Sequence, residues 1–360
     1  MAYTTIDNPE EYFITKLYTG GNGSATTISG LEFQPDMAWV KGRSNTGVHG
    51  VMDSTRSGAN GHGWLRSEST DAENNTSGRG NISSWTSDGF VLSADSWHAV
   101  NYGTNTHVSW SWKANGGTRT TNTESGDNPG GGYQANTTAG FSIVDYTGTG
   151  ATGTMAHGLG AVPDFYMIKN REEVQDWMGY HVGTASDPET DGIRLNTTDA
   201  LTDAATFWND TAPTSTVFTV NTSTNVNKDA ITYIAYCFKS IQGYSKFGSY
   251  TGNGNADGPF VYTGFKPAWI MVKRSESTGT WRVIDVQRNS YNGVFSTLVA
   301  NSDEDDYTED DDFGNTDILS NGFKLRQNYS HVNATGGTYI YMAFAHQPFV
   351  TSGGVPCTAR

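Results

Sequence analysis

The chain has 360 residues, only 16% of them are charged, and the formal net charge is −15. A negatively charged surface repels phosphate groups, so the charge balance argues against nucleic acid and anionic lipid as partners. The chain contains 43 Gly and many Thr, Ser and Asn residues, while 35% of residues are hydrophobic. This composition favours an all-β protein rich in turns over a helical bundle or a disordered chain.

The first strong elements follow a short leader, residues 1–11. Residues 12–19 alternate in polarity and predict a strand, and residues 20–23 form a glycine-rich turn. A short apolar run after Pro35 predicts a central strand, where a proline is tolerated at the start. Asp88-Gly89 then favours a tight hairpin turn, as Asn321-Gly322 does later in the chain, and residues 107–113 form a closing apolar strand.

The same series of signals occurs three times along the chain. A Tyr-Thr-Gly sequence is followed by a proline 17 residues after its tyrosine and by a lysine 6 residues after the proline. The three copies are Tyr18, Pro35 and Lys41; Tyr146, Pro163 and Lys169; and Tyr250, Pro267 and Lys273. The register extends over roughly 100 residues per copy, the size of a small domain. We therefore predict three homologous domains in tandem, at residues 12–117, 140–243 and 244–349.

Each copy contains several short strand signals with turns about every ten residues, which is typical of a two-sheet β-sandwich, and a jelly-roll-like arrangement is expected. Residues 118–139 are rich in Thr, Asn and Gly and read as a linker, so the first domain is expected to stand apart from the other two. Residues 350–360 are expected to form an extended or disordered tail.

The chain carries none of the short sequence motifs that mark common catalytic, phosphate-binding or zinc sites. We therefore predict no enzyme and no cofactor. An Asp-x-x-Arg spacing occurs at Asp53 and Arg56 and again at Asp285 and Arg288, with His181 in the corresponding place of the second repeat. A structural ion pair that holds a turn is the favoured interpretation of this spacing.

An acidic run in the third repeat offers weak candidates for metal ligands. These are Asp303, Asp305, Asp310 and Asp312. Hard cations such as Ca²⁺ prefer carboxylate oxygens, but the run lacks the regular ligand spacing of a calcium loop. A solvated loop is the favoured alternative.

Aromatic residues offer a second kind of candidate site. Flat rings stack on sugars, and Trp64, Trp85 and Trp97 lie in polar, glycine- and serine-rich surroundings of the first repeat. A place in the core is the alternative for each of them, and it is the favoured one.

Several longer stretches carry a resemblance to a known family. The sequences YTGNG, NGFKLR, VNATGGTYIYMAFA and the ending PFVTSGGVPCTAR resemble virion proteins of tailed phages, especially marine and cyanobacterial phages. The resemblance covers nearly the whole chain and implies a non-enzymatic structural protein of the virion, made in the host cytoplasm. It implies a tail fibre or a tail appendage that contacts the host surface through a glycan or a protein, and the short leader favours a compact appendage over a long fibre.

The partners expected from this resemblance are other virion proteins and further copies of the chain. Virion appendages are symmetric, so a homotrimer is favoured. Two alternatives stay open, a decoration protein on the capsid and a glycan-binding or glycan-cleaving module. Nucleic acid binding and membrane insertion are not expected.

Overall fold

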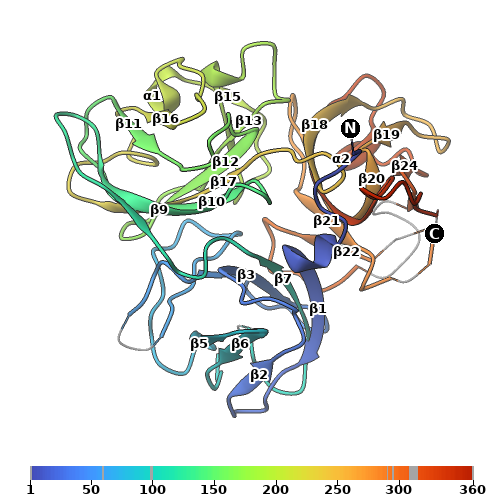
Figure 1. Ribbon diagram of the computed structural model, residues 1–360, viewed down its shortest axis with the longest axis horizontal. Helices are drawn as coiled ribbons and strands as arrows, with labels where there is room; N and C mark the ends of the chain where they lie inside the picture. The colour runs from blue at the N-terminus through green and yellow to red at the C-terminus, as the bar shows by residue number, and fades with distance from the viewer. Residues whose placement is uncertain are drawn as a thin grey trace.

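Three lobes surround a common centre, and each lobe corresponds to one sequence repeat (Figure 1). The computed structural model describes residues 2–58, 61–97, 100–289, 291–293, 296–307 and 315–358. We call residues 12–117 repeat 1, residues 140–243 repeat 2 and residues 244–349 repeat 3. The described residues form several antiparallel sheets and a few single-turn helices, so the predicted all-β class is confirmed. No helix in these ranges is long and apolar enough to cross a membrane.

Each repeat contains a main sheet, and the first four strands named below for each repeat lie side by side in the same spatial order across that sheet. Repeat 1 contains β1 (Phe13–Thr19), β7 (Thr106–Trp112), β3 (Met37–Gly42) and β4 (Gly50–Asp53). Repeat 2 contains β10 (Phe141–Thr147), β17 (Thr232–Phe238), β12 (Phe165–Asn170), β13 (Met178–His181), β14 (Asp191–Arg194) and β15 (Thr202–Asp203). Repeat 3 contains β18 (Ser245–Thr251), β25 (Thr338–Pro348), β20 (Phe265–Arg274), β21 (Arg282–Asp285) and β22 (Thr297–Val299).

A small sheet covers the outer face of each main sheet, which gives every lobe a sandwich-like build. The small sheets consist of β2 (Thr26–Ile28), β6 (Gly89–Leu92) and β5 (Ile82–Thr86); of β11 (Gly153–Ala156) and β16 (Val217–Val220); and of β19 (Phe260–Tyr262), β24 (Gly322–Leu325) and β23 (Thr316–Leu319). The helical turns are η1 (Pro9–Glu11), η2 (Pro188–Thr190), α1 (Ala205–Trp208) and α2 (Ser330–Asn333). The hairpins predicted at Asp88-Gly89 and Asn321-Gly322 are confirmed as β5–β6 and β23–β24.

The central strand β3 is buried on both faces because it separates two cores. Successive side chains of a strand point to opposite faces. Met37 and Trp39 face the centre of the molecule, whereas Ala38 and Val40 face the core of repeat 1 alone. The strands β12 and β20 divide their side chains in the same way. This double burial explains why the sequence after each proline is continuously apolar.

The core at the centre contains residues of all three repeats. The ring centroids of Phe13 and Phe344 lie 4.9 Å apart, those of Trp112 and Trp269 lie 5.9 Å apart, and those of Trp112 and Phe238 lie 6.3 Å apart. The expectation that repeat 1 stands apart is therefore wrong. Burying these large rings together removes apolar surface from water at all three repeats at once.

The segment 118–139, expected to be a linker, contains two strands. These are β8 (Thr120–Asn122) and β9 (Gly130–Asn136), and β9 pairs along its whole length with β10. They extend the main sheet of repeat 2 at its edge. The polar composition is compatible with a strand here because an edge strand is exposed to solvent on much of its surface.

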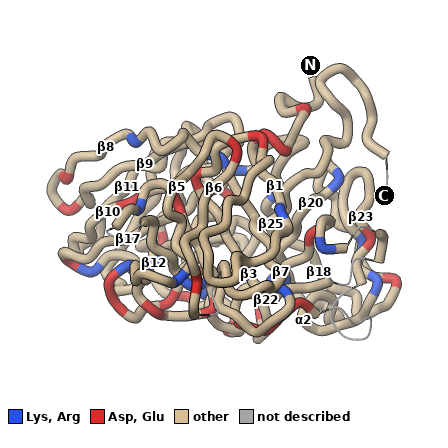
Figure 2. The backbone as a smooth tube through the Cα atoms, turned by 90° about the horizontal axis from the view of Figure 1, so that it is seen from below, with Lys and Arg blue, Asp and Glu red and all other residues tan. Residues whose placement is uncertain are grey.

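Both ends of the chain lie beside repeat 3 (Figures 1 and 2). In the leader, the Tyr3 hydroxyl donates a hydrogen bond of 2.6 Å to the Gly264 carbonyl. The Asp7 carboxylate accepts a bond of 2.6 Å from the backbone N–H of Ser352. The described part of the tail is thus held against the leader, in contrast to the free arm expected from its composition.

Pro267 departs from the predicted place at the start of a strand. It lies inside β20, and the pairing of β20 with β25 shifts register on both sides of it. A proline cannot donate to the ladder, and a bulge is the place inside a sheet where that loss is tolerated. The corresponding Pro35 and Pro163 precede β3 and β12, as predicted.

Candidate functional site

The repeated Tyr-Thr-Gly sequence ties the first strand of each repeat to a loop of the same repeat. The Tyr250 hydroxyl donates to the Val332 carbonyl at 2.7 Å. A Cβ atom at Gly252 would lie 2.3 Å from the carbonyl oxygen of Ala334, so only glycine permits this approach of the two backbones. The corresponding tyrosines bond to Val100 and Val226, and the corresponding glycines are equally crowded. The sequence motif is structural in all three copies.

The repeated lysine links one repeat to the next. The ammonium groups of Lys41, Lys169 and Lys273 donate to backbone carbonyls of a different repeat, at Asp303 (3.2 Å), Thr70 (3.1 Å) and Thr198 (3.3 Å) respectively. Repeat 1 reaches repeat 3, repeat 2 reaches repeat 1, and repeat 3 reaches repeat 2, so the contacts close a ring. Burial lowers the pKa of each lysine to about 8, because a charged ammonium is poorly solvated there.

Further donors cross the same three junctions in the same order. The indole N–H of Trp177 donates to the Arg66 carbonyl at 2.6 Å, and that of Trp281 donates to the Arg194 carbonyl at 2.8 Å. The corresponding residue of repeat 1 is His49, whose Nε2 lies 3.0 Å from the Val299 carbonyl. Backbone hydrogen bonds cross each junction as well: Gly47 to Asp303 and Asp306 to Arg43; Gln175 to Thr70 and Glu73 to Arg171; Gly279 to Thr198 and Leu201 to Ser275.

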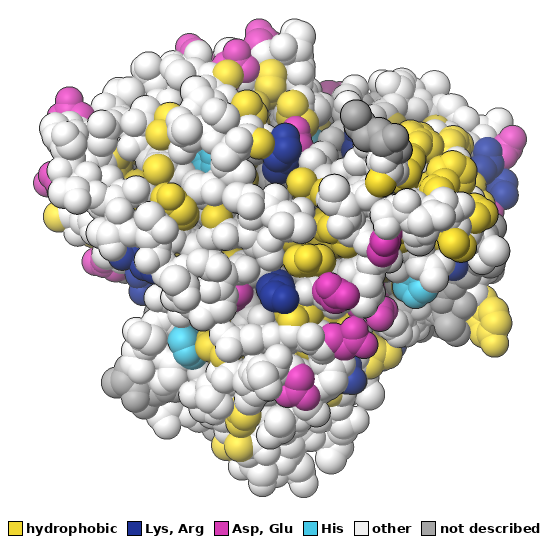
Figure 3. Space-filling view, viewed as in Figure 1, with side chains coloured by type: hydrophobic (Ala, Val, Ile, Leu, Met, Phe, Trp, Pro, Cys, Tyr) yellow, Lys and Arg dark blue, Asp and Glu magenta, His cyan; other side chains and the backbone are white. Residues whose placement is uncertain are grey.

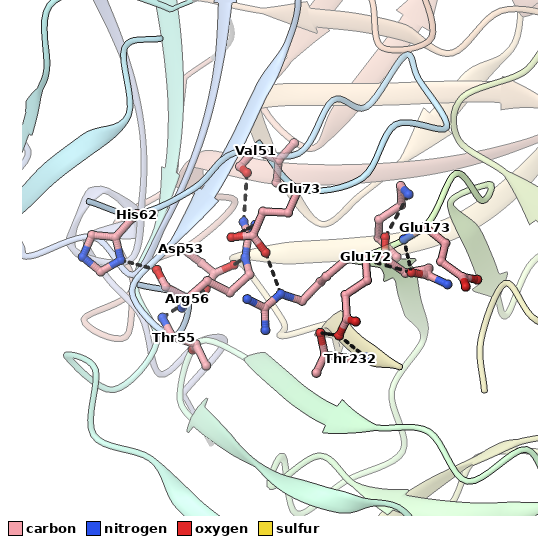
Figure 4. Close-up of polar contacts among 12 residues, drawn as sticks. Val51, Asp53, Thr55, Arg56, His62, Glu73, Glu172, Glu173 and Thr232 are labelled. Atoms are coloured by element: carbon pink, nitrogen blue, oxygen red, sulfur yellow. Dashed lines mark hydrogen bonds and ion pairs between the residues drawn. The ribbon is translucent and has the colours of Figure 1, made fainter. Parts of the chain in front are cut away.

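A fully buried ion pair lies where repeats 1 and 2 meet (Figure 4). Arg56 Nε donates to Asp53 Oδ2 at 2.6 Å, and an Nη of the same guanidinium donates to the Val51 carbonyl at 2.9 Å. The Tyr236 hydroxyl of repeat 2 donates to Asp53 Oδ2 at 2.6 Å. The positive charge of Arg56 and these hydrogen bonds offset the cost of burial and keep the pKa of Asp53 below its usual value.

The ion pair continues toward the surface through two further charged side chains. Glu73 Oε1 lies 3.5 Å from Arg56 Nη1, and Glu73 Oε2 accepts a bond of 2.6 Å from Arg171 Nε of repeat 2. Figure 4 shows Glu73 beside Arg56, with Glu172 and Thr232 farther out. Glu172 accepts bonds from the Thr232 N–H at 2.9 Å and the Thr232 hydroxyl at 2.6 Å. Each charged side chain in this series, from Asp53 to Glu172, lies beside an opposite charge or accepts hydrogen bonds.

Repeat 3 builds the same arrangement against repeat 1. Arg288 Nε donates to Asp285 Oδ2 at 2.6 Å, and the Trp110 indole N–H donates to the same oxygen at 3.0 Å. Asp306 accepts from Arg288 at 2.8 Å and from Arg43 of repeat 1 at 3.2 Å. The interpretation of the Asp-x-x-Arg spacing as a structural ion pair that holds a turn agrees with this geometry. Both ion pairs also form hydrogen bonds with side chains of a neighbouring repeat.

The junction between repeats 2 and 3 lacks the ion pair for a physical reason. Tyr236 and Trp110 stand at corresponding positions of β17 and β7, and the corresponding residue of β25 is Met342. Methionine has no N–H or O–H to offer a buried carboxylate. His181 stands where the other repeats have aspartate, and its Nε2 lies 3.0 Å from the Tyr341 carbonyl. Burial lowers the pKa of His181 to about 4, so the ring is neutral at neutral pH and has one N–H group that can donate a hydrogen bond.

Near the junction of repeats 1 and 2, a polar hollow of about 330 Å³ lies beside the β8–β9 hairpin. Its lining includes Arg119 and Arg171 together with Glu124 and Asp145. Both arginines are already paired, Arg119 with Asp145 at 2.6 Å and Arg171 with Glu73 at 2.6 Å. The hollow thus presents balanced charges, which suit a polar neutral molecule better than an anion.

Residues 8–348 match the family model described as a domain of unknown function, DUF7483. The chain belongs to the DUF7483 family. No curated protein and no solved structure matches it. The match runs across all three repeats, so the family unit includes the junctions as well as the individual sheets.

In this DUF7483 chain the three predicted tryptophans have different surroundings. Trp64 is fully buried in the core of repeat 1, Trp85 is half-buried against the same core, and Trp97 is 41% exposed. The guanidinium of Arg79 lies 3.5 Å from the centre of the Trp97 ring, and that of Arg66 lies 4.9 Å from it. Cation–π contacts of this kind occupy ring surface that a sugar would need. The three residues do not form one platform.

The acidic run is described only in part. Asp303 and Asp305 are exposed, and Asp310 and Asp312 lie outside the described residues. Among the residues that the structure describes, no group of three potential metal ligands comes together. Asp306 of the same run has a different role, since it binds two arginines across the junction between repeats 3 and 1.

Sequence reasoning missed the role of the lysines and the place of two exposed aromatic residues. The equal spacing of Lys41, Lys169 and Lys273 was visible, but nothing in the sequence indicates that each one reaches another repeat. Phe260 and Tyr262 are 46% and 54% exposed on β19 of the small sheet in repeat 3. Their signal was available, because the aligned positions of the other repeats hold no aromatic residue.

Proposed function

We propose that this protein is a structural protein of a tailed-phage particle, built from three homologous jelly-roll-like sandwiches in tandem. In this proposal it forms an exposed appendage, located on the tail, that contacts the host surface. It is proposed to act without catalysis and to assemble with other virion proteins and with further copies of itself, a trimer being favoured.

The observation that carries the proposal is that residues shared by the three repeats and residues that differ between them have different roles. Residues common to the repeats, such as the three lysines and the Tyr-Thr-Gly tyrosines, support the fold or cross the junctions. The repeats differ most in sequence around residues 64–97, 187–214 and 303–312, where residues such as Glu73, Leu201 and Asp306 cross the junctions and others, such as Trp97 and Asp187, are exposed to solvent. A packed scaffold that presents differing loops suits display and attachment. The phage family that the sequence resembles supplies the setting.

Electron microscopy of purified phage particles that encode the protein tests this proposal. Gold-labelled antibodies against the chain are expected to mark the tail, and the same antibodies are expected to reduce adsorption to host cells. Labelling over the head with unchanged adsorption would instead support a capsid decoration protein. Particles without any label would contradict the virion proposal.

Sedimentation velocity tests the proposed assembly separately. A homotrimer is expected to persist at micromolar concentration. A stable monomer at that concentration would contradict it, and the three repeats within one chain would then provide the only approximate threefold arrangement.

A further inference from the structure

The small outer sheets offer three versions of one strand, which allow a comparison within the molecule. In repeat 3, Val261 of β19 pairs with Phe323 and faces the core. Ile28 of β2 pairs with Phe90 in the same way in repeat 1. In repeat 2, β11 occupies the corresponding place beside β16. The core-facing residue is apolar in every version, as the fold requires.

The residues on either side of this core position differ between the repeats. Repeat 3 has Phe260 and Tyr262, which are 46% and 54% exposed. Repeat 1 has Thr27 at the first position, and repeat 2 has Thr154 and Ala156. Two repeats therefore form this strand with small side chains at positions where repeat 3 presents two aromatic rings to solvent. The fold does not require the rings, so a binding role explains them better than packing does.

The two rings are supported from below and from the side. A Cβ atom at Gly322 would lie 2.9 Å from Cε2 of Phe260, so the Phe260 ring rests over the backbone of the neighbouring strand β24. The Tyr262 hydroxyl lies 3.3 Å from that of Tyr3, which donates a bond of 2.6 Å to the Gly264 carbonyl. In the space-filling view, hydrophobic side chains gather over this lobe (Figure 3). Each residue thus has a contact that holds it in place while about half of its surface is exposed to solvent.

The size of this surface favours a small or chain-like ligand over a protein. A buried Phe or Tyr contributes about 150–250 Å² of contact area, so the exposed halves of the two rings amount to roughly 200 Å². A stable protein interface needs about 800 Å² on each partner. The apolar faces of one or two sugar rings are of the smaller size, and their hydroxyl groups can bond to the phenol of Tyr262.

The charges around the rings favour a neutral ligand. Lys324, the cross-strand neighbour of Phe260, pairs with Asp257 at 2.9 Å. Arg326 pairs with Asp317 at 2.5 Å. The nearby cations are therefore already balanced, and the net charge of −15 repels polyanions at longer range.

We propose that Phe260 and Tyr262 form a platform that binds a neutral glycan by stacking of its sugar rings. This site deepens the proposed contact with the host surface and rests on that proposal for its biological meaning. The interaction forms no covalent bond, and its specificity comes from the spacing of the two rings and from the hydroxyl groups of Tyr262 and Tyr3.

Binding of the full chain to neutral hexasaccharides tests the platform. Cellohexaose, laminarihexaose and mannohexaose serve as probes in isothermal titration calorimetry, and the parent polysaccharides serve in affinity gel electrophoresis. The double variant Phe260→Thr with Tyr262→Ala carries residues that the other repeats use at these positions, so we expect it to fold. Binding of at least one probe is expected, with at least a tenfold loss of affinity in the double variant.

Tyr291→Ala provides the matched control, because Tyr291 is 80% exposed at a different place in repeat 3. Its affinity is expected to equal that of the unchanged chain, and circular dichroism on heating verifies that both variants fold. Failure of the unchanged chain to bind any probe would overturn the platform, as would equal binding by the double variant. A dimer that the double variant loses in light scattering would overturn it too, by identifying a second copy as the occupant. None of these results affects the labelling of virions, so the platform and the virion proposal can fail separately.

Discussion

Every repeat contributes to a junction with a neighbouring repeat, and every repeat also has a small outer sheet. These two regions differ in how strongly burial restricts the choice of side chain. At the junction of repeats 2 and 3, His181 stands in place of the aspartate of the other repeats, and Met342 stands in place of a side chain that can donate a hydrogen bond. On the outer sheets, Phe260 and Tyr262 replace small residues while the core position beneath them stays apolar. A buried polar group needs a hydrogen-bond partner within the protein, whereas an exposed polar group can form hydrogen bonds with water. The junctions therefore hold the molecule together and the outer faces are open to change.

The largest expected effect is the loss of a buried charge at a junction. Arg56→Met leaves the Asp53 carboxylate buried without its cation, and we expect the free energy of unfolding in urea to fall by about 3–5 kcal/mol. The double variant Asp53→Asn with Arg56→Met removes both charges and is expected to regain part of that loss. A fall of less than about 1 kcal/mol in the single variant would show that the pair does not fasten the junction.

Acid is expected to weaken the junction of repeats 2 and 3 at His181, and also the junction of repeats 1 and 3, where burial lowers the pKa of His49. The pKa of His181 is lowered to about 4 in the folded protein, against about 6.5 in an unfolded chain. The unfolded chain therefore binds the proton first, and the stability that neutral His181 contributes is present above pH 6.5 and is lost as the pH falls through 4. The full loss is on the order of 3 kcal/mol.

Urea unfolding at pH 7 and at pH 4.5 measures this difference. In His181→Gln, whose amide N–H₂ can donate to the same carbonyl without titrating, the destabilisation between the two pH values is expected to be smaller than in the unchanged chain. An equal pH dependence in the two proteins would exclude His181 as its source.

A close backbone contact within one repeat is expected to matter somewhat less. Gly252→Ala places a Cβ atom 2.3 Å from the Ala334 carbonyl oxygen, so the chain must shift to admit it. Overpacking of this kind costs typically about 1–3 kcal/mol. Gly353→Ala is the control, since the nearest atom to its added Cβ is 3.9 Å away. Equal melting temperatures of the two variants would show that the contact is not needed.

The smallest effect on stability is expected at the outer face. Phe260→Thr with Tyr262→Ala exchanges exposed rings for residues that the other repeats use, so the free energy of unfolding should change by no more than about 0.5 kcal/mol. A loss as large as that at a junction would mean that the rings support the fold, and the contrast between the two regions would disappear.

Local sequence patterns were sufficient to predict the strands and the hairpin turns. Apolar runs after Pro35, Pro163 and Pro267 indicated central strands, and Asp88-Gly89 and Asn321-Gly322 indicated hairpins. Polarity alternation and turn residues act over a few residues, so their effect can be read directly. The burial of Trp64 was also favoured, but its neighbours could not be named.

The sequence by itself determined that the chain is an all-β protein with one pattern written three times, because strand formers, turn residues and the Tyr, Pro and Lys spacing are all local or countable features. Only the tertiary structure decided that the three main sheets share one central core, that residues 118–139 extend a sheet, and that each lysine bonds to another repeat. These contacts join residues far apart in the chain; Lys41 and Asp303, for example, are 262 positions apart. A carbonyl that accepts such a bond is available at every residue, so composition carries no sign of which one is chosen.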